Sequence, residues 1–348
     1  MGQIDLKIEP QDIVLFHVGG SGGYYGPIDA VIDRFPQQCV VFGFEARETN
    51  EDKIMLESYR QKGVRTVLVN RCVAERSGRM PFFINKHGES SSMLAPSPSA
   101  LMEHVVYPGI HTWGENTELE RETTVDTISL QEFVGAQEVV PDVLSIDAQG
   151  MELHVMRGAG DWMRFANCVV SEVEFFEIYS GQALFDEQMS FLDGYGFRLT
   201  DLLNRQYWHP GPACNEGFLT VAEALWFRKI TSFLELNAAD KHFVLRGIKL
   251  SAVAFSFERY SYSYMLLKRL IDFDKALVSD LCRQHGFEIL LKMVAEIDNK
   301  LRNYSLDNMF FMRNPLSVQA GARPRFTRKP LSHVITKVGS MVIRYLPV

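Results

Sequence analysis

Residues 13–23, with the sequence IVLFHVGGSGG, decide the predicted fold. Six residues that are apolar apart from His17 run into four glycines arranged around Ser21, a pattern typical of a buried strand that ends in a tight turn. Glycine lets a backbone approach a ligand closely, and the N–H groups of a following helix can bind a negative group. The stretch therefore predicts the first strand of a ligand-binding α/β domain.

Strand and helix signals continue to alternate as far as residue 227. The predicted strands are 39–45, 64–69, 142–147, 168–173, 197–199 and 219–227, and the predicted helices are 27–35, 50–62, 151–163 and 186–195. A crossover between parallel strands needs a helix and is right-handed. The order therefore predicts an α/β fold with a sheet of about seven strands and helices on both faces. Between Met80 and Glu122 the pattern is less regular and predicts loops.

The region after Arg228 loses its strand signals, and apolar residues recur there at helical spacing, as at Leu245, Ile248 and Ala252. Three or four packed helices are the simplest interpretation. At one domain per ~150 residues, a chain of 348 residues is expected to hold two units or one large domain with an extension. We predict a first domain over 1–228, a helical domain over 229–310, and a basic linker with a C-terminal helix over 311–348.

Charge is distributed unevenly along the chain, although the net charge is only −7. From Met309 onward there are seven basic residues and no acidic residue, which leaves 29 basic and 43 acidic residues before it. An acidic body argues against a general nucleic-acid binder. The basic end is where contact with an anion or a membrane is expected.

The C-terminal segment 323–346 predicts a basic amphipathic helix. Its apolar residues from Leu331 onward share one helix face, while His333, Lys337 and Arg344 lie opposite. Such a helix can lie on an anionic membrane surface, which would make the protein peripheral at the inner membrane face. The alternative is a helix that docks on its own domain or on a second subunit, as in a homo-oligomer formed through the helical C-terminus.

The cysteines and histidines predict neither disulfides nor a metal centre. The five cysteines are odd in number and never form a CxxC pair, which is typical of reduced thiols. The histidines show no HxxxH or HExxH spacing, so we expect no metal site. No apolar targeting segment opens the chain, and no run of ~18 apolar residues occurs in it. These features predict a cytoplasmic protein.

The glycine turn matches neither of two common phosphate-binding patterns. No register of residues 19–26 gives GxGxxG, and GxxxxGK[ST] fails because Ser21 and Pro27 stand where Gly and Lys are needed. This disfavours a nicotinamide enzyme and a P-loop NTPase. The GxSxG turn over residues 19–23 instead suits an adenosyl ligand without a pyrophosphate.

Three acidic residues at predicted strand ends are candidates for the site. Glu45, at the end of the second strand, can accept both ribose hydroxyls of an adenosine, and the alternative is a solvated loop acid. Asp147, at the end of the fourth strand, can bind an ammonium or take a proton, unless it only caps the next helix. Glu172, at the end of the fifth strand, lies on the same rim.

Residues 16–23 (FHVGGSGG), 42–45 (FGFE), 146–152 (IDAQGME) and 172–175 (EVEF) follow one another in a fixed order. Together with CVA at 72–74, ESSSM at 89–93 and the stretches 179–185 and 196–199, they resemble the FkbM-type S-adenosylmethionine-dependent methyltransferases. The first three segments are similar to DVGAN-x-G, AFEP and IDVEGAE of that family, and EVEF with its continuation is the most specific. The resemblance covers residues 13–227.

The resemblance implies a Rossmann-like class I methyltransferase fold with S-adenosylmethionine as cofactor, and methyl transfer to a hydroxyl of a sugar or a natural product. It assigns the methionine part of the cofactor to Gly19, Gly20, Ser21 and Gly23, the ribose to Glu45, and the adenine region to Cys72. Asp147 would lie between cofactor and acceptor, as the base or as the partner of the methionine ammonium. Glu172 is the second candidate catalytic residue.

Three residues depart from the family pattern: His17 replaces an acid, Ser21 replaces Asn, and Gln149 replaces Glu. Two carboxylates that would pair with the ammonium and sulfonium of the cofactor are therefore missing. Either cofactor binding is weakened or other acids compensate, namely Asp147, Glu152 and Glu172. His17 lies inside an apolar strand and is expected to be packed and hydrogen-bonded rather than a base.

The first hypothesis for the function is an S-adenosylmethionine-dependent O-methyltransferase that acts on a sugar hydroxyl in a glycan or glycolipid precursor. The second is an O-methyltransferase for small natural products, and the third is a catalytically weak adenosyl-binding scaffold that recruits partners. The stretch 207–212 (YWHPGP) predicts either an aromatic platform for the acceptor or a loop stiffened by proline. The same alternatives apply to His111 and Trp113.

Overall fold

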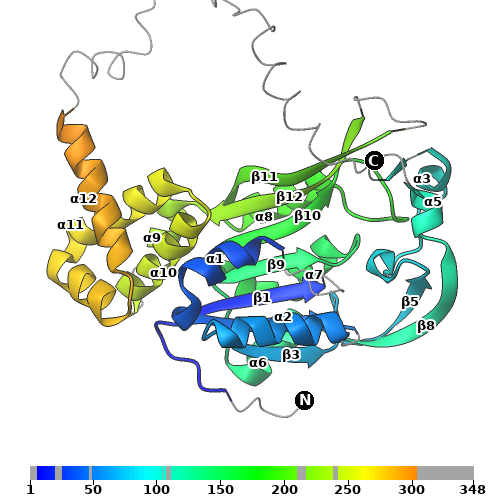
Figure 1. Ribbon diagram of the computed structural model, residues 1–348, viewed down its shortest axis with the longest axis horizontal. Coiled ribbons are helices and arrows are strands. Elements are labelled where there is room, and N and C mark those ends of the chain that lie inside the picture. Colours follow the sequence, from blue (N-terminus) through cyan, green and yellow to red (C-terminus); the bar gives the residue numbers. More distant parts are fainter. Residues whose placement is uncertain are drawn as a thin grey trace, which may run out of the picture. The chain divides into compact units, whose positions relative to one another are not determined.

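A seven-stranded sheet forms the centre of the fold (Figure 1). The computed structural model describes residues 6–19, 26–46, 49–103, 105–106, 111–209, 217–237 and 242–303. In sheet order, the strands are β11 (Phe197–Trp208), β12 (Phe218–Arg228), β10 (Cys168–Glu174), β9 (Val143–Asp147), β1 (Ile13–Gly19), β2 (Cys39–Glu45) and β3 (Arg65–Asn70). The predicted α/β fold is therefore confirmed.

Five of these strands are joined by parallel pairing and give the sheet two different ends. The parallel strands are β1, β2, β3, β9 and β10, whereas β12 is antiparallel to both of its neighbours. We call the side where the five strands begin the amino end of the sheet and the side where they finish the carboxyl end. The chain winds from β1 outward to β3 and then returns to β9 on the other side of β1. Ligands of open α/β sheets bind at such a switch, outside the carboxyl ends of the strands.

Helices cover both faces of the sheet, so its parallel strands are apolar throughout. In β1, Ile13 and Leu15 contact one hydrophobic cluster and Val14 and Phe16 contact the other. The first cluster includes residues of α1 (Asp29–Arg34) and α2 (Asn50–Gln61). The second includes residues of α6 (Leu130–Gln137), α7 (Glu152–Gly158) and α8 (Phe185–Gly194).

A second sheet of three strands departs from the prediction. β4 (Cys72–Val73), β8 (Leu119–Ile128) and β5 (Gly78–Asn85) pair in that order. The expectation of loops between Met80 and Glu122 is wrong for β5 and the start of β8. Their side chains are largely exposed or half-buried, so they carry little apolar periodicity. The rest of that region holds the short elements α3 (Pro98–Glu103), β6 (Val105–Val106), β7 (His111–Thr112) and α5 (Trp113–Asn116).

Within the described residues, four helices follow the last strand, as expected from the helical spacing after Arg228. They are α9 (Ile230–Asn237), α10 (Phe243–Ser256), α11 (Tyr260–Gln284) and α12 (Glu288–Asn303). α10 is buried along almost its whole length. A Cβ on its Gly247 would lie 2.6 Å from the side chain of Leu270, so α10 and α11 pack closely together at this glycine.

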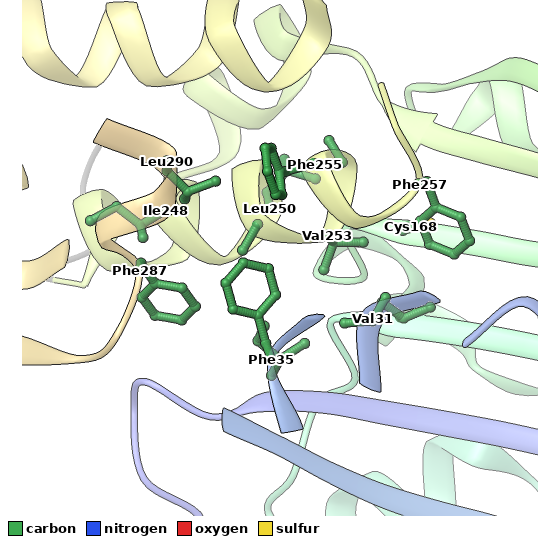
Figure 2. Close-up of a cluster of buried hydrophobic side chains, with 14 of the residues drawn as sticks. Val31, Phe35, Cys168, Ile248, Leu250, Val253, Phe255, Phe257, Phe287 and Leu290 are labelled. Atoms are coloured by element: carbon green, nitrogen blue, oxygen red, sulfur yellow. The ribbon is translucent and has the colours of Figure 1, made fainter. Parts of the chain in front are cut away.

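The helical extension shares its core with one face of the sheet. Figure 2 shows side chains of α10 in one cluster with those near α1 and those that lead into α12, among them Val31, Phe35, Ile248, Val253, Phe287 and Leu290. The same cluster reaches the strands through Ile13, Val143 and Cys168. The extension therefore provides one layer of the core that covers the sheet.

By packing, residues Met1–Ile297 form one compact unit and Asp298–Val348 form a second one. The division into 1–228, 229–310 and 311–348 stays a prediction about which pieces fold on their own. The amphipathic segment 323–346 lies outside the described residues. None of the described helices is both long and apolar enough to span a membrane.

Candidate active site

Gly19 and Asp147 meet at the winding switch of the sheet. They end β1 and β9 and are paired directly in the register of these strands. Gly19 has a φ of +82°, and a Cβ built on it would lie 1.7 Å from the backbone oxygen of Asp147. Only glycine fits there, so the first glycine of the turn allows the two strand ends to pack together. The other predicted contacts of the methionine part lie outside the described residues, namely Gly20, Ser21 and Gly23.

Glu45 ends β2 with a buried carboxylate. The residue is only 4% exposed, and its Oε1 has no hydrogen-bond partner among the described residues. Burial raises the pKa of Glu45 to about 8, with the charges of Asp52 and Asp147 adding to the rise. The alternative of a solvated loop acid is therefore wrong. A buried oxygen that can accept from a ligand hydroxyl remains.

Cys72, predicted for the adenine region, lies in β4 within a small apolar cluster. Its buried neighbours there are Ala74, Met93 and Met151. Burial raises the pKa of the Cys72 thiol to about 12, and the charge of Glu45 adds to this rise. The thiol is therefore protonated and offers an apolar surface close to the Glu45 carboxylate. All described cysteines are free thiols, namely Cys39, Cys72, Cys168 and Cys282.

Gln149 connects the two predicted catalytic acids. Its Nε2 donates to Oδ1 of Asp147 at 2.7 Å and to Oε2 of Glu172 at 3.3 Å. Its Oε1 accepts from the hydroxyl of the buried Tyr179 at 2.8 Å. An amide can donate to two carboxylates at once, whereas a glutamate at this position would add a further negative charge beside them. Gln149, which replaces the family's glutamate, therefore links Asp147 and Glu172, which we call the acid pair.

The acid pair holds protons more tightly than ordinary carboxyls do. Burial raises the pKa of Asp147, against a lowering effect of the hydrogen bond from Gln149. The pKa of Glu172 is raised well above its usual range, first by burial and then by the charges of Asp147 and Glu174. Their titrations are linked because the two groups interact. Carboxyls with raised pKa values are suited to accept a proton near neutral pH.

A cavity at the carboxyl end of the sheet is lined by both members of the pair. Its other lining residues include His17, Ser145, Glu223, Gly26 and Pro27. His17 is buried in β1, and its Nδ1 is hydrogen-bonded to the hydroxyl of Ser145 at 3.0 Å. The prediction that His17 is a packed and hydrogen-bonded residue is confirmed.

Glu152 binds the backbone in front of α7. Its Oε1 accepts from the N–H groups of Ala148 and Gly150 at 2.8 and 3.2 Å. The N-cap residue of α7 is Met151, which makes no side-chain cap hydrogen bond. The alternative that Asp147 only caps this helix is therefore wrong. Asp147 lines the cavity instead. Burial raises the pKa of Glu152 to about 7.

Glu174 ends β10 as a completely buried acid. The residue is 0% exposed, and neither carboxylate oxygen has a hydrogen-bond partner among the described residues. Burial, followed by the charges of Glu152 and Asp147, raises its pKa well above the usual range. One oxygen from each of Glu152, Glu172 and Glu174 lies within 4.8 Å of the other two.

Two of the aromatic residues proposed as an acceptor platform belong to the core, whereas Tyr207 is 52% exposed. Trp208 and Trp113 are 3% and 5% exposed, with ring centroids 5.2 Å apart. The indole nitrogen of Trp113 donates to the backbone oxygen of Ile178 at 3.0 Å. Neither indole is therefore open for stacking on a sugar. Residues 210–212 and the side chain of His111 lie outside the described part.

Sequence reasoning missed the contacts of Gln149, Tyr179 and Glu174. A signal for Glu174 is present, since Glu172 and Glu174 alternate with a valine in an otherwise apolar strand and period two places both on one face. Gln149 and Tyr179 are 30 positions apart and meet only through the folded turn. No local pattern predicts that contact.

The geometry can be compared with known families. The family model of the methyltransferase FkbM domain matches residues 17–199, which is more than half of the chain. No curated protein and no solved structure matches the chain. The central sheet has a Rossmann-like class I methyltransferase architecture, with C-terminal helices added to it. The chain belongs to the FkbM methyltransferase family.

Proposed function

We propose that the protein is an S-adenosylmethionine-dependent O-methyltransferase that modifies a sugar hydroxyl in a glycan or glycolipid precursor. Membership of the FkbM family supports methyl transfer in general. The observation that carries the finer proposal is the cavity in which Asp147 and Glu172 lie at the winding switch of the sheet. A cofactor and an acceptor can meet there against a pair of proton-accepting groups.

The residues at the carboxyl end of the sheet fit S-adenosylmethionine, which when bound supplies an electrophilic methyl group. Glu45 would accept from the ribose hydroxyls through its unpartnered oxygen, and Cys72 would contribute to an apolar surface for the adenine. Gly19 keeps the strand end free of a side chain. The ligand is positively charged at its sulfonium and ammonium, and the acidic site complements those charges. This supports the compensation expected for the missing family carboxylates.

Asp147 and Glu172 are proposed to remove the proton of the acceptor hydroxyl. Both line the cavity, and Gln149 holds them in one hydrogen-bonded set. Their raised pKa values favour uptake of a proton. Most of the rate is expected to come from holding the acceptor oxygen in line with the methyl group, since a bound and aligned pair reacts as a unimolecular system.

An acceptor with several hydroxyl groups fits this cavity better than an apolar one. Carboxylates of Asp147, Glu172 and Glu223 line it, and ionised carboxylates only accept hydrogen bonds. A sugar offers adjacent hydroxyl donors to such a surface. An apolar natural product would leave these groups desolvated without partners, which is unfavourable. Action in the cytoplasm or at the inner membrane face, with 323–346 as the membrane contact, is part of the proposal.

Calorimetric titration with S-adenosylmethionine tests the cofactor. We expect saturable binding, and no binding at millimolar cofactor would contradict both enzyme hypotheses. Cell glycans and glycolipids made with and without the protein would then be compared by mass spectrometry, with an isotope-labelled methyl donor. A labelled methyl on a sugar oxygen supports the proposal. Binding without transfer to any sugar would instead favour the natural-product enzyme or the scaffold.

Asp147→Asn is expected to lower kcat by about 10²–10⁴-fold, because it removes the general base while preserving size. The cofactor KM should change little if Asp147 acts as the base. A raised cofactor KM with an unchanged kcat would instead assign Asp147 to the methionine ammonium. Asp161→Asn is a matched control, since the Asp161 side chain is 90% exposed in a remote turn.

A further inference from the structure

Glu152, Glu172 and Glu174 form a compact carboxylate cluster beside the cavity. One oxygen from each residue lies within 4.8 Å of the other two. The residues come from the start of α7 and the last three positions of β10, so regular elements hold all three. Glu152 and Glu174 are 0% exposed. The cluster is therefore a fixed feature of the fold.

The cluster has no cationic side chain to balance it. In the part of the chain that the structure describes, no ion pair involves any of the three acids. Oε2 of Glu152 and both oxygens of Glu174 are buried without a hydrogen-bond partner among the described residues. Buried charges are normally paired or bound to a metal. These three unpartnered oxygens therefore point to a positively charged ligand.

We propose that Glu152, Glu172 and Glu174 bind a hard divalent cation of the Mg²⁺ or Mn²⁺ type. Three oxygen donors without sulfur or nitrogen favour such ions over zinc or copper. Ligands on opposite sides of Mg²⁺ are about 4.1 Å apart, and those of the larger Ca²⁺ about 5 Å apart. The three oxygens lie within 4.8 Å of one another, so they are close enough together to contact one ion. A divalent ion also neutralises two of the three negative charges.

A cation bound there would be accessible from the cavity. Glu172 belongs to the cluster and also lines the cavity, and Gln149 links it to Asp147. Three protein ligands leave coordination positions for water or for an oxygen of a bound molecule. The expectation of no metal site is based on the spacing of histidines. That spacing gives no information about a site made of carboxylates alone. The proposal does not rest on the acceptor or cofactor proposed above.

Direct titration with Mn²⁺ tests the site without any methyl donor or acceptor. The full-length protein is treated with a chelator, desalted, and titrated with MnCl₂, with free Mn²⁺ measured by electron paramagnetic resonance. We expect one bound ion per chain, displaced by excess MgCl₂. Absence of binding at millimolar Mn²⁺ would overturn the proposal. That result would leave the test of methyl transfer unaffected.

Glu174→Gln separates this cluster from other acidic sites. The substitution keeps the shape and removes a carboxylate ligand whose oxygens have no hydrogen-bond partner among the described residues. We expect Mn²⁺ affinity to fall by at least about tenfold, since affinity depends on the number of charged ligands. Glu223→Gln is the matched control, because Glu223 lines the same cavity but lies outside the cluster. Its affinity should change by less than about threefold.

The outcomes are distinct even if one variant folds poorly. Thermal unfolding of the wild-type chain should shift upward with Mn²⁺ and not with an equal ionic strength of NaCl. Glu174→Gln should lose this shift. Equal Mn²⁺ affinity of Glu174→Gln and the wild type would overturn the assignment. A larger loss in Glu223→Gln than in Glu174→Gln would overturn it as well.

Discussion

The two ends of the central sheet hold their buried acids in opposite ways. At the amino end, Asp142 in front of β9 pairs with Lys249 of α10 at 2.8 Å, and Asp12 in front of β1 pairs with Arg65 at 2.5 Å. Lys249 also donates to the backbone oxygen of Asp12 at 2.8 Å, and Val14 donates to Asp142 at 3.0 Å. Each of these buried charges meets an opposite charge or a dipole.

At the carboxyl end, buried acids face one another instead. Glu45, Glu152 and Glu174 lack cationic partners among the described residues, and burial is the largest cause of their raised pKa values. Unpaired buried charge destabilises a fold, so it persists mainly where a ligand uses it. The pairs at the amino end therefore stabilise the molecule, and the unpaired acids support the proposal that binding and chemistry take place at the carboxyl end.

Lys249→Met at the amino end is expected to have the largest effect among the variants that test this contrast. It leaves Asp142 buried without its cation, which should lower the free energy of unfolding by about 3–5 kcal/mol. Urea denaturation measures the loss. Lys275→Met, on the exposed side of α11, should change it by less than about 0.5 kcal/mol. The double variant with Asp142→Asn should recover part of the loss, and strict additivity of the two would contradict the pairing argument.

Glu45→Ala, at the carboxyl end, is expected to have the next largest effect, which is on cofactor affinity. It should weaken S-adenosylmethionine binding by about 10- to 100-fold, because the ribose hydroxyls lose their hydrogen-bond acceptor. Calorimetry measures the affinity, and circular dichroism checks that the variant is folded. Glu57→Ala, an exposed acid of α2, serves as the control with unchanged affinity. Unaltered binding in Glu45→Ala would show that the ribose lies elsewhere.

Glu45→Gln sharpens the comparison through pH dependence. The folded-state pKa of Glu45 is raised from 4.5 to about 8. A group whose pKa is raised on folding stabilises the folded state at pH values below its unfolded-state pKa. This contribution is lost as the pH rises through the folded-state pKa. Without cofactor, the variant and the wild type should have similar free energies of unfolding near pH 4.5. At pH 8.5 the variant should be more stable by at least about 1 kcal/mol.

Urea unfolding of both chains across that pH range is the measurement. A stability difference that does not grow with pH would contradict the raised pKa of Glu45. Saturating cofactor should raise the free energy of unfolding less in Glu45→Gln than in the wild type, since the variant lacks the carboxylate that the ligand would contact.

Sequence patterns predicted the central sheet because its strands are buried on both faces and therefore form apolar runs. β5 and β8 escaped prediction because most of their side chains are not buried and their pairing joins distant segments. Glu45, Asp147 and Glu172 were identifiable as acids at the ends of apolar strands. Their linkage was not, because the contacts of Gln149 depend on a turn with φ of +52° at that residue.

Assignment of a role to Glu152 and Glu174 also required the three-dimensional structure. The two residues are 22 positions apart in the sequence and approach each other only because α7 begins beside the end of β10. Burial without partners depends on all surrounding segments at once. Such properties arise from packing and have no local sequence signal.

The shared core of the sheet and the extension has a consequence for synthesis of the chain. Ile13 of β1 and Val294 of α12 belong to one hydrophobic cluster. A ribosome adds about 5–20 residues per second, beginning at the N-terminus, so the first strand leaves the exit tunnel long before its last packing partner is translated. Until then, one apolar face of the nascent sheet is uncovered and can be bound by chaperones. Folding of the methyltransferase region is therefore completed only after α12 has been translated.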